Sequence, residues 1–112
     1  MHELSMCRSI VNTAAKHAGG RSVSQVTVRI GHLRQVVPEA LQFSWAAVSG
    51  TTALEDAVLV IEQVPAVVGC AMCGAETTLD VPILACGRCG GFDVKLISGE
   101  ELFVVSIDLV EA

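Results

Sequence analysis

Four of the five cysteines in this 112-residue chain form two close pairs, Cys70-x2-Cys73 and Cys86-x2-Cys89, with residues 74–85 between them. A C-x2-C pair folds into a tight turn whose two sulfurs can face one cation. Two such turns supply four thiolates in the tetrahedral arrangement that Zn²⁺ accepts. The spacing therefore predicts a closed, structural four-cysteine zinc site with no position left open for a catalytic water.

Other uses of the two cysteine pairs are weaker interpretations. Disulfides would need an oxidising compartment, a single redox dithiol would leave the second pair unexplained, and iron could occupy the same cage. Glycines also support the zinc interpretation, because tight turns often need positive φ or a close approach of backbone to sulfur. They lie at Gly74, Gly87, Gly90 and Gly91.

The N-terminus, Met1-His2-Glu3, is a second place where metal chemistry is possible. The α-amine, the His2 backbone nitrogen and the His2 imidazole can close adjacent chelate rings on one cation. Nitrogen donors in a plane suit Ni²⁺ or Cu²⁺ better than Zn²⁺. The simpler alternative is that His2 is an ordinary solvated terminal residue.

Two helices are predicted in the part of the sequence that precedes the cysteine pairs. Apolar residues recur at three- and four-residue spacing over residues 4–18, and Gly19-Gly20 ends this segment. Pro38 opens a second helix over residues 38–49. The apolar positions are Leu4, Cys7, Ile10, Val11, Ala14 and Ala18 in the first helix, and Leu41, Trp45 and Val48 in the second, with Phe43 flanking.

Three strands are predicted at residues 23–30, 57–64 and 102–110. Val26, Val28 and Ile30 share one face of the first, and Phe103, Val105, Ile107 and Leu109 share one face of the last. Because the cysteine segment lies between the second and third strands, we expect an α+β fold. It has a small domain of two helices and a three-stranded sheet (residues 1–65 plus 99–112) and an inserted zinc-ribbon-like domain (residues 66–98).

Composition limits the function classes. The net charge is −5 and aromatic residues make up 4%, and four thiolates holding one Zn²⁺ would bring the charge to about −7. A nucleic-acid-binding ribbon usually carries a basic face with stacking aromatics, so protein partners or cationic cargo fit better. No apolar run reaches the roughly 18–20 residues of a membrane span, and no secretion signal is recognisable. We expect a cytoplasmic protein that contacts neither nucleic acid nor membrane.

Several single residues have modest expected roles. Cys7 lies on the apolar side of the first helix and is predicted to be a buried small hydrophobe. His17 suits the negative end of that helix, and His32 is expected in a loop. Arg8 lies on the polar side of the first helix, where it could meet an acidic partner.

Several sequence features occur here in one order and together resemble the HypA/HybF family of hydrogenase nickel-incorporation proteins. They are Met1-His2-Glu3-Leu4-Ser5, Val37-Pro38-Glu39-Ala40-Leu41-Gln42-Phe43, the two C-x2-C pairs, Ser98-Gly99-Glu100-Glu101-Leu102 and Ser106-Ile107-Asp108-Leu109. The resemblance covers essentially the whole chain. It is more specific than the cysteines alone, because zinc ribbons are many.

The resemblance implies a nickel metallochaperone, not an enzyme, with two metal sites. The nickel site would involve the N-terminal tripeptide, with His2 supplying the side-chain ligand and Met1 and Glu3 contributing through backbone or nearby atoms. The zinc site would be Cys70, Cys73, Cys86 and Cys89. Implied partners are a HypB-type GTPase and the [NiFe]-hydrogenase large subunit, and in some organisms the urease maturation proteins. We expect a monomer or a weak dimer.

Two other functions are compatible with the residues alone. A zinc-ribbon adaptor for protein interactions would carry no nickel and would not need His2. A small redox protein would show readily oxidised, low-pKa thiols when free of zinc.

Overall fold

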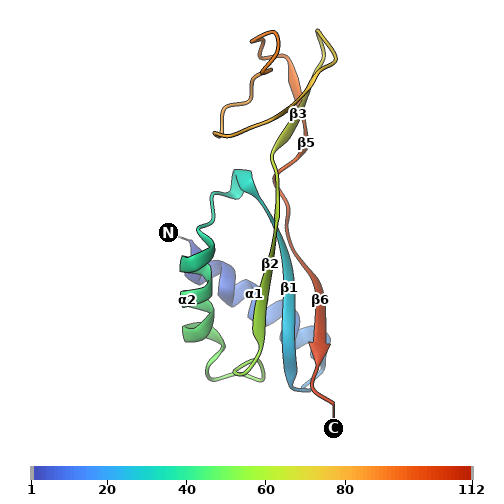
Figure 1. The fold of residues 1–112 in the computed structure, drawn as a ribbon. Helices are drawn as coiled ribbons and strands as arrows, with labels where there is room; N and C mark the ends of the chain where they lie inside the picture. The colour runs from blue at the N-terminus through green and yellow to red at the C-terminus, as the bar shows by residue number, and fades with distance from the viewer. Residues whose placement is uncertain (1, 112) are drawn as a thin grey trace. The chain divides into compact units, whose positions relative to one another are not determined.

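The computed structural model describes residues 2–111, which form two α-helices and two three-stranded sheets, with strand orders β2-β1-β6 and β4-β3-β5. The predicted α+β class is confirmed. The elements are α1 (Glu3–Ala18), β1 (Val23–Gly31), the short 3-10 helix η1 (His32–Arg34), α2 (Pro38–Ser49), β2 (Val58–Val64), β3 (Val67–Cys70), β4 (Glu76–Thr78), β5 (Val94–Ser98) and β6 (Leu102–Leu109) (Figure 1).

The chain divides into two compact units. The first comprises the chain up to Arg29, Val36–Glu62 and the chain from Phe103, and the second comprises Ile30–Gln35 and Gln63–Leu102. Residues 30–35 therefore belong to the cysteine-bearing unit, although the chain reaches them at the end of β1. Neither described helix has the length and apolar composition needed to cross a bilayer.

In the first unit α1 packs against α2 and crosses behind the β2-β1-β6 sheet (Figure 1). The buried side of α1 contains the predicted apolar positions except Leu4, which is 44% exposed. Met6 and Glu3 are buried in its place. The covered arc is displaced because α1 is packed by a second helix as well as by the sheet, which a periodicity argument with a single apolar face does not anticipate.

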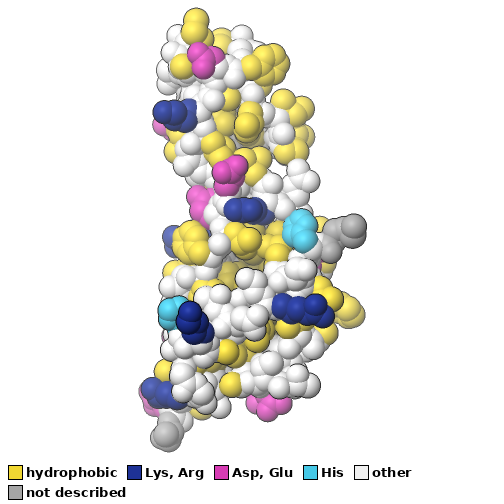
Figure 2. All heavy atoms as spheres, turned by 180° about the vertical axis from the view of Figure 1, so that it is seen from behind, with side chains coloured by type: hydrophobic (Ala, Val, Ile, Leu, Met, Phe, Trp, Pro, Cys, Tyr) yellow, Lys and Arg dark blue, Asp and Glu magenta, His cyan; other side chains and the backbone are white. Residues whose placement is uncertain are grey.

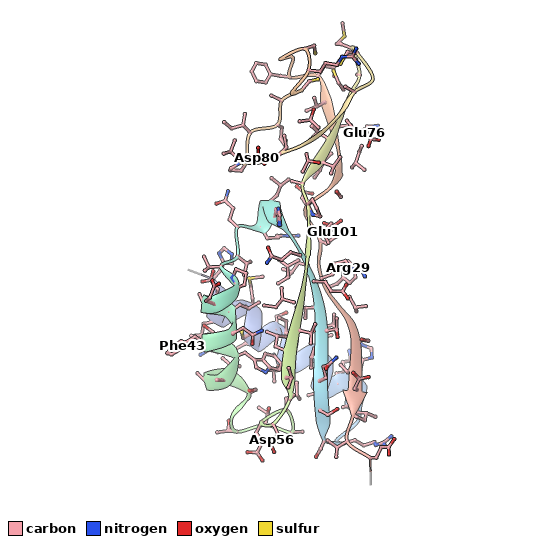
Figure 3. The ribbon with its side chains drawn as sticks, viewed as in Figure 1. Arg29, Phe43, Asp56, Glu76, Asp80 and Glu101 are labelled. Carbon is pink, nitrogen blue, oxygen red and sulfur yellow. The ribbon has the colours of Figure 1, made fainter. Side chains whose placement is uncertain are left out.

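Side-chain hydrogen bonds fasten α2 along the edge of β2. The Trp45 indole donates to the Ala57 carbonyl at 2.9 Å, and the Gln42 amide donates to the Leu59 carbonyl at 2.8 Å. Leu41 is fully buried, whereas Phe43 is 82% exposed and points away from the helix (Figure 3). One otherwise open edge of the sheet is thereby covered.

The opposite face of this sheet is open. Val26, Val28 and Ile30 are buried, whereas Phe103 and Val105, which share a face as predicted, are 48% and 40% exposed. The Arg29 guanidinium lies 5.6 Å from the centre of the Phe103 ring, so that face of β6 is the one facing away from the core. The helices cover only one side of the sheet.

The second unit is built on β3, which pairs antiparallel with both β4 and β5. Val67 pairs with Thr78 on one side, and Cys70 pairs with Val94 on the other. These strands were not predicted. Seven large apolar side chains of this unit are exposed: Met72, Val81, Ile83, Leu84, Phe92, Ile97 and Leu102.

Within the second unit, main-chain hydrogen bonds join residues 30–35 to residues 99–101. Gly31 donates its N–H to the Glu101 carbonyl at 2.8 Å, and Leu33 donates to the Gly99 carbonyl at 2.9 Å. A Cβ on Gly31 would lie 2.0 Å from the Gly99 carbonyl carbon. Only glycine allows the two backbones to come this close.

Candidate metal centre

The two C-x2-C segments fold into nearly identical turns. Gly74 donates its N–H to the Cys70 carbonyl at 2.9 Å, and Gly90 donates to the Cys86 carbonyl at 3.0 Å. Each of these glycines has a positive φ, 76° and 75° respectively, which a residue with a side chain adopts only at a cost. The predicted glycine requirement is thus confirmed at these two positions, one in each turn.

Each turn is closed at its base by a second main-chain bond. Cys70 donates its N–H to the Ala75 carbonyl at 2.9 Å, and Cys86 donates to the Gly91 carbonyl at 2.8 Å. The β3–β4 connection carries the first turn, whereas the second turn lies in the irregular segment before β5. Because the chain makes the same turn twice, it presents two equivalent pairs of sulfurs.

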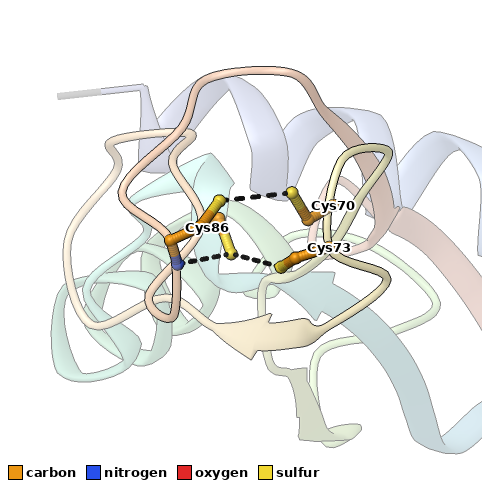
Figure 4. A group of neighbouring side chains, drawn as sticks. Cys70, Cys73 and Cys86 are labelled. Atoms are coloured by element: carbon orange, nitrogen blue, oxygen red, sulfur yellow. Dashed lines mark hydrogen bonds between the residues drawn. The ribbon is translucent and has the colours of Figure 1, made fainter.

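The four sulfurs converge on one point. The Sγ atoms of Cys70 and Cys89 are 3.7 Å apart, and those of Cys73 and Cys86 are 3.5 Å apart (Figure 4). All four lie within 4.8 Å of one another. Four sulfurs at about 2.3 Å from a tetrahedral Zn²⁺ would be separated by roughly 3.8 Å. The cluster therefore fits a metal of this size and coordination.

Backbone N–H groups favour the thiolate form at two of these cysteines. Hydrogen bonds from the Cys89 and Arg88 N–H groups, each 3.4 Å from the sulfur, lower the pKa of Cys86 to about 6. N–H groups of Cys73 and Met72 likewise lower the pKa of Cys70. In each turn, one cysteine therefore ionises more readily to the thiolate, which is the form that binds a metal.

The other two cysteines titrate in the opposite direction. The Ala75 N–H favours the Cys73 thiolate, but this is outweighed by the hydrogen bond to Cys86 and by burial, so the pKa of Cys73 rises to about 11. The pKa of Cys89 is also raised: the Gly91 N–H opposes the rise, and hydrogen bonding with Cys70 and Cys86 drives it. Four adjacent thiolates repel one another, so a bound cation is needed to hold them all ionised.

A polar contact outside the cysteines joins the two halves of the cluster. The Gly87 N–H donates to Thr77 Oγ1 at 2.9 Å, which links β4 to the second turn. A Cβ on Gly87 would lie 2.9 Å from the Thr77 methyl. Sequence reasoning missed Thr77, because a threonine ten residues from its partner has no spacing signature.

The predicted N-terminal site lies at the start of α1. His2 is exposed and precedes the helix, accepting the Met6 N–H on its carbonyl at 3.0 Å. Glu3 is only 7% exposed and occupies the first turn, where the helix dipole favours a negative charge. Met1, the third predicted member, lies outside the described residues. The structure thus presents the His2 imidazole at an exposed position but does not test the set as a nickel site.

The remaining cysteine and histidines lie away from the sulfur cluster. Cys7 is fully buried, as predicted, and its thiol donates to the Leu41 carbonyl at 3.4 Å. Burial is the main cause that raises its pKa to about 11. His17 is exposed at the last turn of α1, and His32 begins η1.

Comparison with known proteins places these features in context. Residues 1–109 match the family described as "HypA: Hydrogenase/urease nickel incorporation, metallochaperone, hypA". A hydrogenase maturation factor HypA of Geotalea daltonii is 43% identical over 98% of this chain and 100% of its own length. The HypA of Nostoc sp. is 39% identical over 99% of this chain and 97% of its own length.

Solved structures share the fold. The solution structure of the Ni metallochaperone HypA from Helicobacter pylori superposes with a TM-score of 0.69 at 20% identity and covers 100% of both chains. A second HypA solution structure has a TM-score of 0.61 at 17% identity, over 96% of this chain and 92% of that one. At these identities the likeness shows the fold alone.

Proposed function

The chain belongs to the HypA family of nickel-incorporation metallochaperones, and we propose that it delivers Ni²⁺ during maturation of [NiFe]-hydrogenase. The observation that carries this proposal is the family match over residues 1–109, which includes both predicted metal-binding segments. A metallochaperone moves an ion without transforming it, so the chain is a maturation factor and not an enzyme. Urease maturation is a second destination that the family description admits.

The four-cysteine cluster is proposed to hold zinc permanently. Its ligands would be Cys70, Cys73, Cys86 and Cys89, whose sulfurs lie within 4.8 Å of one another. When bound, Zn²⁺ supplies the charge that keeps four thiolates together and cross-links the two turns. Four protein ligands fill a tetrahedral ion, so no position remains for catalysis or for rapid exchange.

The cargo site is proposed to be the N-terminus, with the His2 imidazole as the side-chain ligand of Ni²⁺. The Met1 amine and the His2 backbone nitrogen would complete adjacent chelate rings, and Glu3 lies next in sequence. Exposure of His2 supports this assignment, because a partner must reach an ion to take it by ligand exchange. Nickel binding is therefore assigned to residues 1–65 plus 99–112, and zinc binding to residues 66–98.

The proposed partners follow from this role. A HypB-type GTPase would supply nucleotide chemistry, since no phosphate-binding glycine loop occurs in the sequence. The [NiFe]-hydrogenase large subunit would receive the ion, with urease maturation proteins as alternative recipients. We place this exchange in the cytoplasm, where thiols stay reduced, and propose a monomer or a weak dimer.

Metal analysis of untagged protein tests the assignment, because a tag would alter the amine. We expect about one zinc per chain and one Ni²⁺ site that is lost in His2→Ala. His17→Ala is the matched control, because it removes an exposed imidazole from the other end of α1 and should leave nickel binding unchanged. Zinc without any His2-dependent nickel binding would favour a zinc-ribbon adaptor instead.

A further inference from the structure

The charge of the N-terminal third of the chain differs from that of the rest. Between Glu3 and Glu39 the sequence has five Lys or Arg residues and no Asp or Glu. From Glu39 onward it has two basic and eleven acidic residues. A protein with a net charge of −5 has therefore gathered most of its cations into one segment.

Part of this segment is the outer side of α1. Arg8, Asn12 and Lys16 are exposed and lie at four-residue intervals, so they form one row on the helix surface. At 1.5 Å per residue the two cations are about 12 Å apart along the axis. Glu3, the one acidic residue of α1, is buried. Arg21, which follows the helix, is also exposed. We call these four residues, Arg8, Asn12, Lys16 and Arg21, the basic face.

The space-filling view shows this side of the first unit. Lys, Arg and His side chains are spread across the surface of that unit, and Asp and Glu side chains are visible at its edges, one of them against the lowest Lys or Arg side chain (Figure 2). Along α1 the basic face is thus not interleaved with exposed carboxylates, in contrast to an ordinary solvated helix surface on which both signs alternate.

The cations of the basic face have no partner of their own within residues 2–111. Arg8, Lys16 and Arg21 make no side-chain hydrogen bond or ion pair there. Two other cations of the same segment are engaged: Arg29 pairs with Glu62, and Arg34 donates to the Glu100 carbonyl. The face therefore keeps its charge and its hydrogen-bond donors available for another molecule.

We propose that the basic face docks an acidic surface of a protein partner. Complementary charge steers such an encounter and fixes its orientation. A nucleic acid fits less well, because three cations can neutralise only about three phosphates. The chain is acidic elsewhere, and the face has no aromatic side chain on which a base could stack.

The position of the basic face gives the docking a consequence. His2 immediately precedes α1 and is exposed, so a partner held along this helix lies beside the start of the helix. This consequence, which is transfer of nickel between His2 and that partner, rests on the proposed function. The docking itself does not depend on nickel.

Charge reversal tests the docking. The binding partners used are the purified HypB-type GTPase and the purified [NiFe]-hydrogenase large subunit of the same organism, titrated with the full chain at about 50 mM salt. Lys16→Glu is compared with Lys95→Glu, since Lys95 is an exposed cation in β5 and its reversal changes the net charge equally. For at least one partner we expect affinity to fall about ten-fold in Lys16→Glu and further in Arg8→Glu/Lys16→Glu. Lys95→Glu should bind as the wild type, and the differences should shrink with added salt.

Three results would overturn the proposal. The first is an equal loss of affinity in Lys16→Glu and Lys95→Glu, and the second is an unchanged affinity of Lys16→Glu for both partners. The third is a duplex RNA that binds the wild-type chain more tightly than either protein does. Lys16→Gln serves as a milder variant if the reversed charge disturbs folding. Nickel titration of the same variants separates the two proposals, because a failed docking would leave His2-dependent nickel binding intact.

Discussion

The two units of this protein hold themselves together in different ways. The first buries a continuous set of apolar side chains, among them Leu41, Leu54, Val26 and Val28, each at 0% exposure. In the second, Met72 and Phe92 are more than 75% exposed, at 76% and 77%. The second unit contains Gln63–Leu102 and Ile30–Gln35, a size at which an apolar core alone is marginal. A metal held by its four converging sulfurs would compensate for that deficit.

This difference suits the division of labour proposed for the molecule. A unit held by its own core can present an exposed N-terminus without relying on any ion. A unit held by a metal keeps its fold only while the metal stays, so its site must not be the one that releases cargo. Permanence and exchange are therefore assigned to separate parts of the chain.

Loss of the metal should produce the largest effect. Extraction with a strong chelator removes a binding free energy of about 10–16 kcal/mol from the second unit, and Cys86→Ser weakens the same binding by deleting one of its four thiolates. We expect its backbone amides, such as those of Cys70 and Ala71, to lose hydrogen-exchange protection while those of Val26 and Val28 keep theirs. NMR-detected exchange measures both units at once.

The control for that experiment is Cys7→Ala, which deletes a cysteine outside the cluster. It should leave the metal content at its wild-type value. Simultaneous loss of protection in both units of Cys86→Ser would show that the first unit also depends on the metal, and the comparison would fail.

Truncation of a core side chain should instead destabilise the first unit and leave the metal content of the second unit unchanged. Leu41 is fully buried, so Leu41→Ala should lower the free energy of unfolding of the first unit by 2–5 kcal/mol. Phe43→Ala, on the same helix at 82% exposure, should change it by about 0.5 kcal/mol or less. Denaturant titration followed by Trp45 fluorescence gives both values. A fall in metal stoichiometry in Leu41→Ala would contradict the independence of the two units.

Sequence reasoning was accurate where a repeating pattern specified the structure. The helices, the strands of the first sheet and the cysteine spacing all have periodic or motif signals, and the observed elements lie within one or two residues of the predicted ranges. The convergence of four sulfurs could also be predicted, because each C-x2-C turn directs its two sulfurs toward one point and the two turns need only face each other.

It was incomplete where packing by distant residues decides. β3, β4 and β5 have three to five residues each, too few for alternation to appear. Thr77 contacts Gly87, and Gly31 lies against Gly99. Neither contact could be predicted from the spacing of residues in the sequence. The orientation of β6 is another case, because nothing in its alternation tells which face the helices cover.

The two units should respond oppositely to pH. Burial raises the pKa of Cys7 from 9.0 to about 11, so its contribution is fully present below pH 9 and is lost as the pH rises through 11. The loss is at most about 2–3 kcal/mol. The free energy of unfolding of the first unit, measured between pH 8 and pH 11, should decline by this amount in the wild type and by less in Cys7→Ala. An identical decline in both proteins would assign it to other groups.

The second unit should weaken toward acid. In the metal-free chain, backbone N–H groups lower the pKa of Cys86 from 9.0 to about 6. The stabilisation by the Cys86 thiolate is present above pH 9 and is lost as the pH falls through 6, whereas the raised pKa of Cys73 has the opposite effect on stability. Protons also compete with the metal for all four sulfurs, so release of metal on acidification should accompany the loss of β3–β5 protection.

The smallest effect is expected at the surface of the first unit. Arg29 Nη2 lies 2.9 Å from Glu62 Oε1, with side chains 40% and 46% exposed, and the Arg29 guanidinium also lies over the Phe103 ring. Glu62→Gln should therefore lower the free energy of unfolding of this unit by only 0.2–1 kcal/mol, as measured by denaturant titration. Asp56→Asn, at an exposed position in the loop before β2, is the matched control.

Salt decides whether that small effect is electrostatic. In about 1 M salt the screening length falls to roughly 3 Å, so the difference between Glu62→Gln and the wild type should disappear. If instead it persists, Glu62 acts by positioning Arg29 over the Phe103 ring, and the open face of the sheet contributes more to the stability of the first unit than its exposure implies. In that case the first unit would draw stability from both faces of its sheet, and its contrast with the metal-dependent second unit would become stronger.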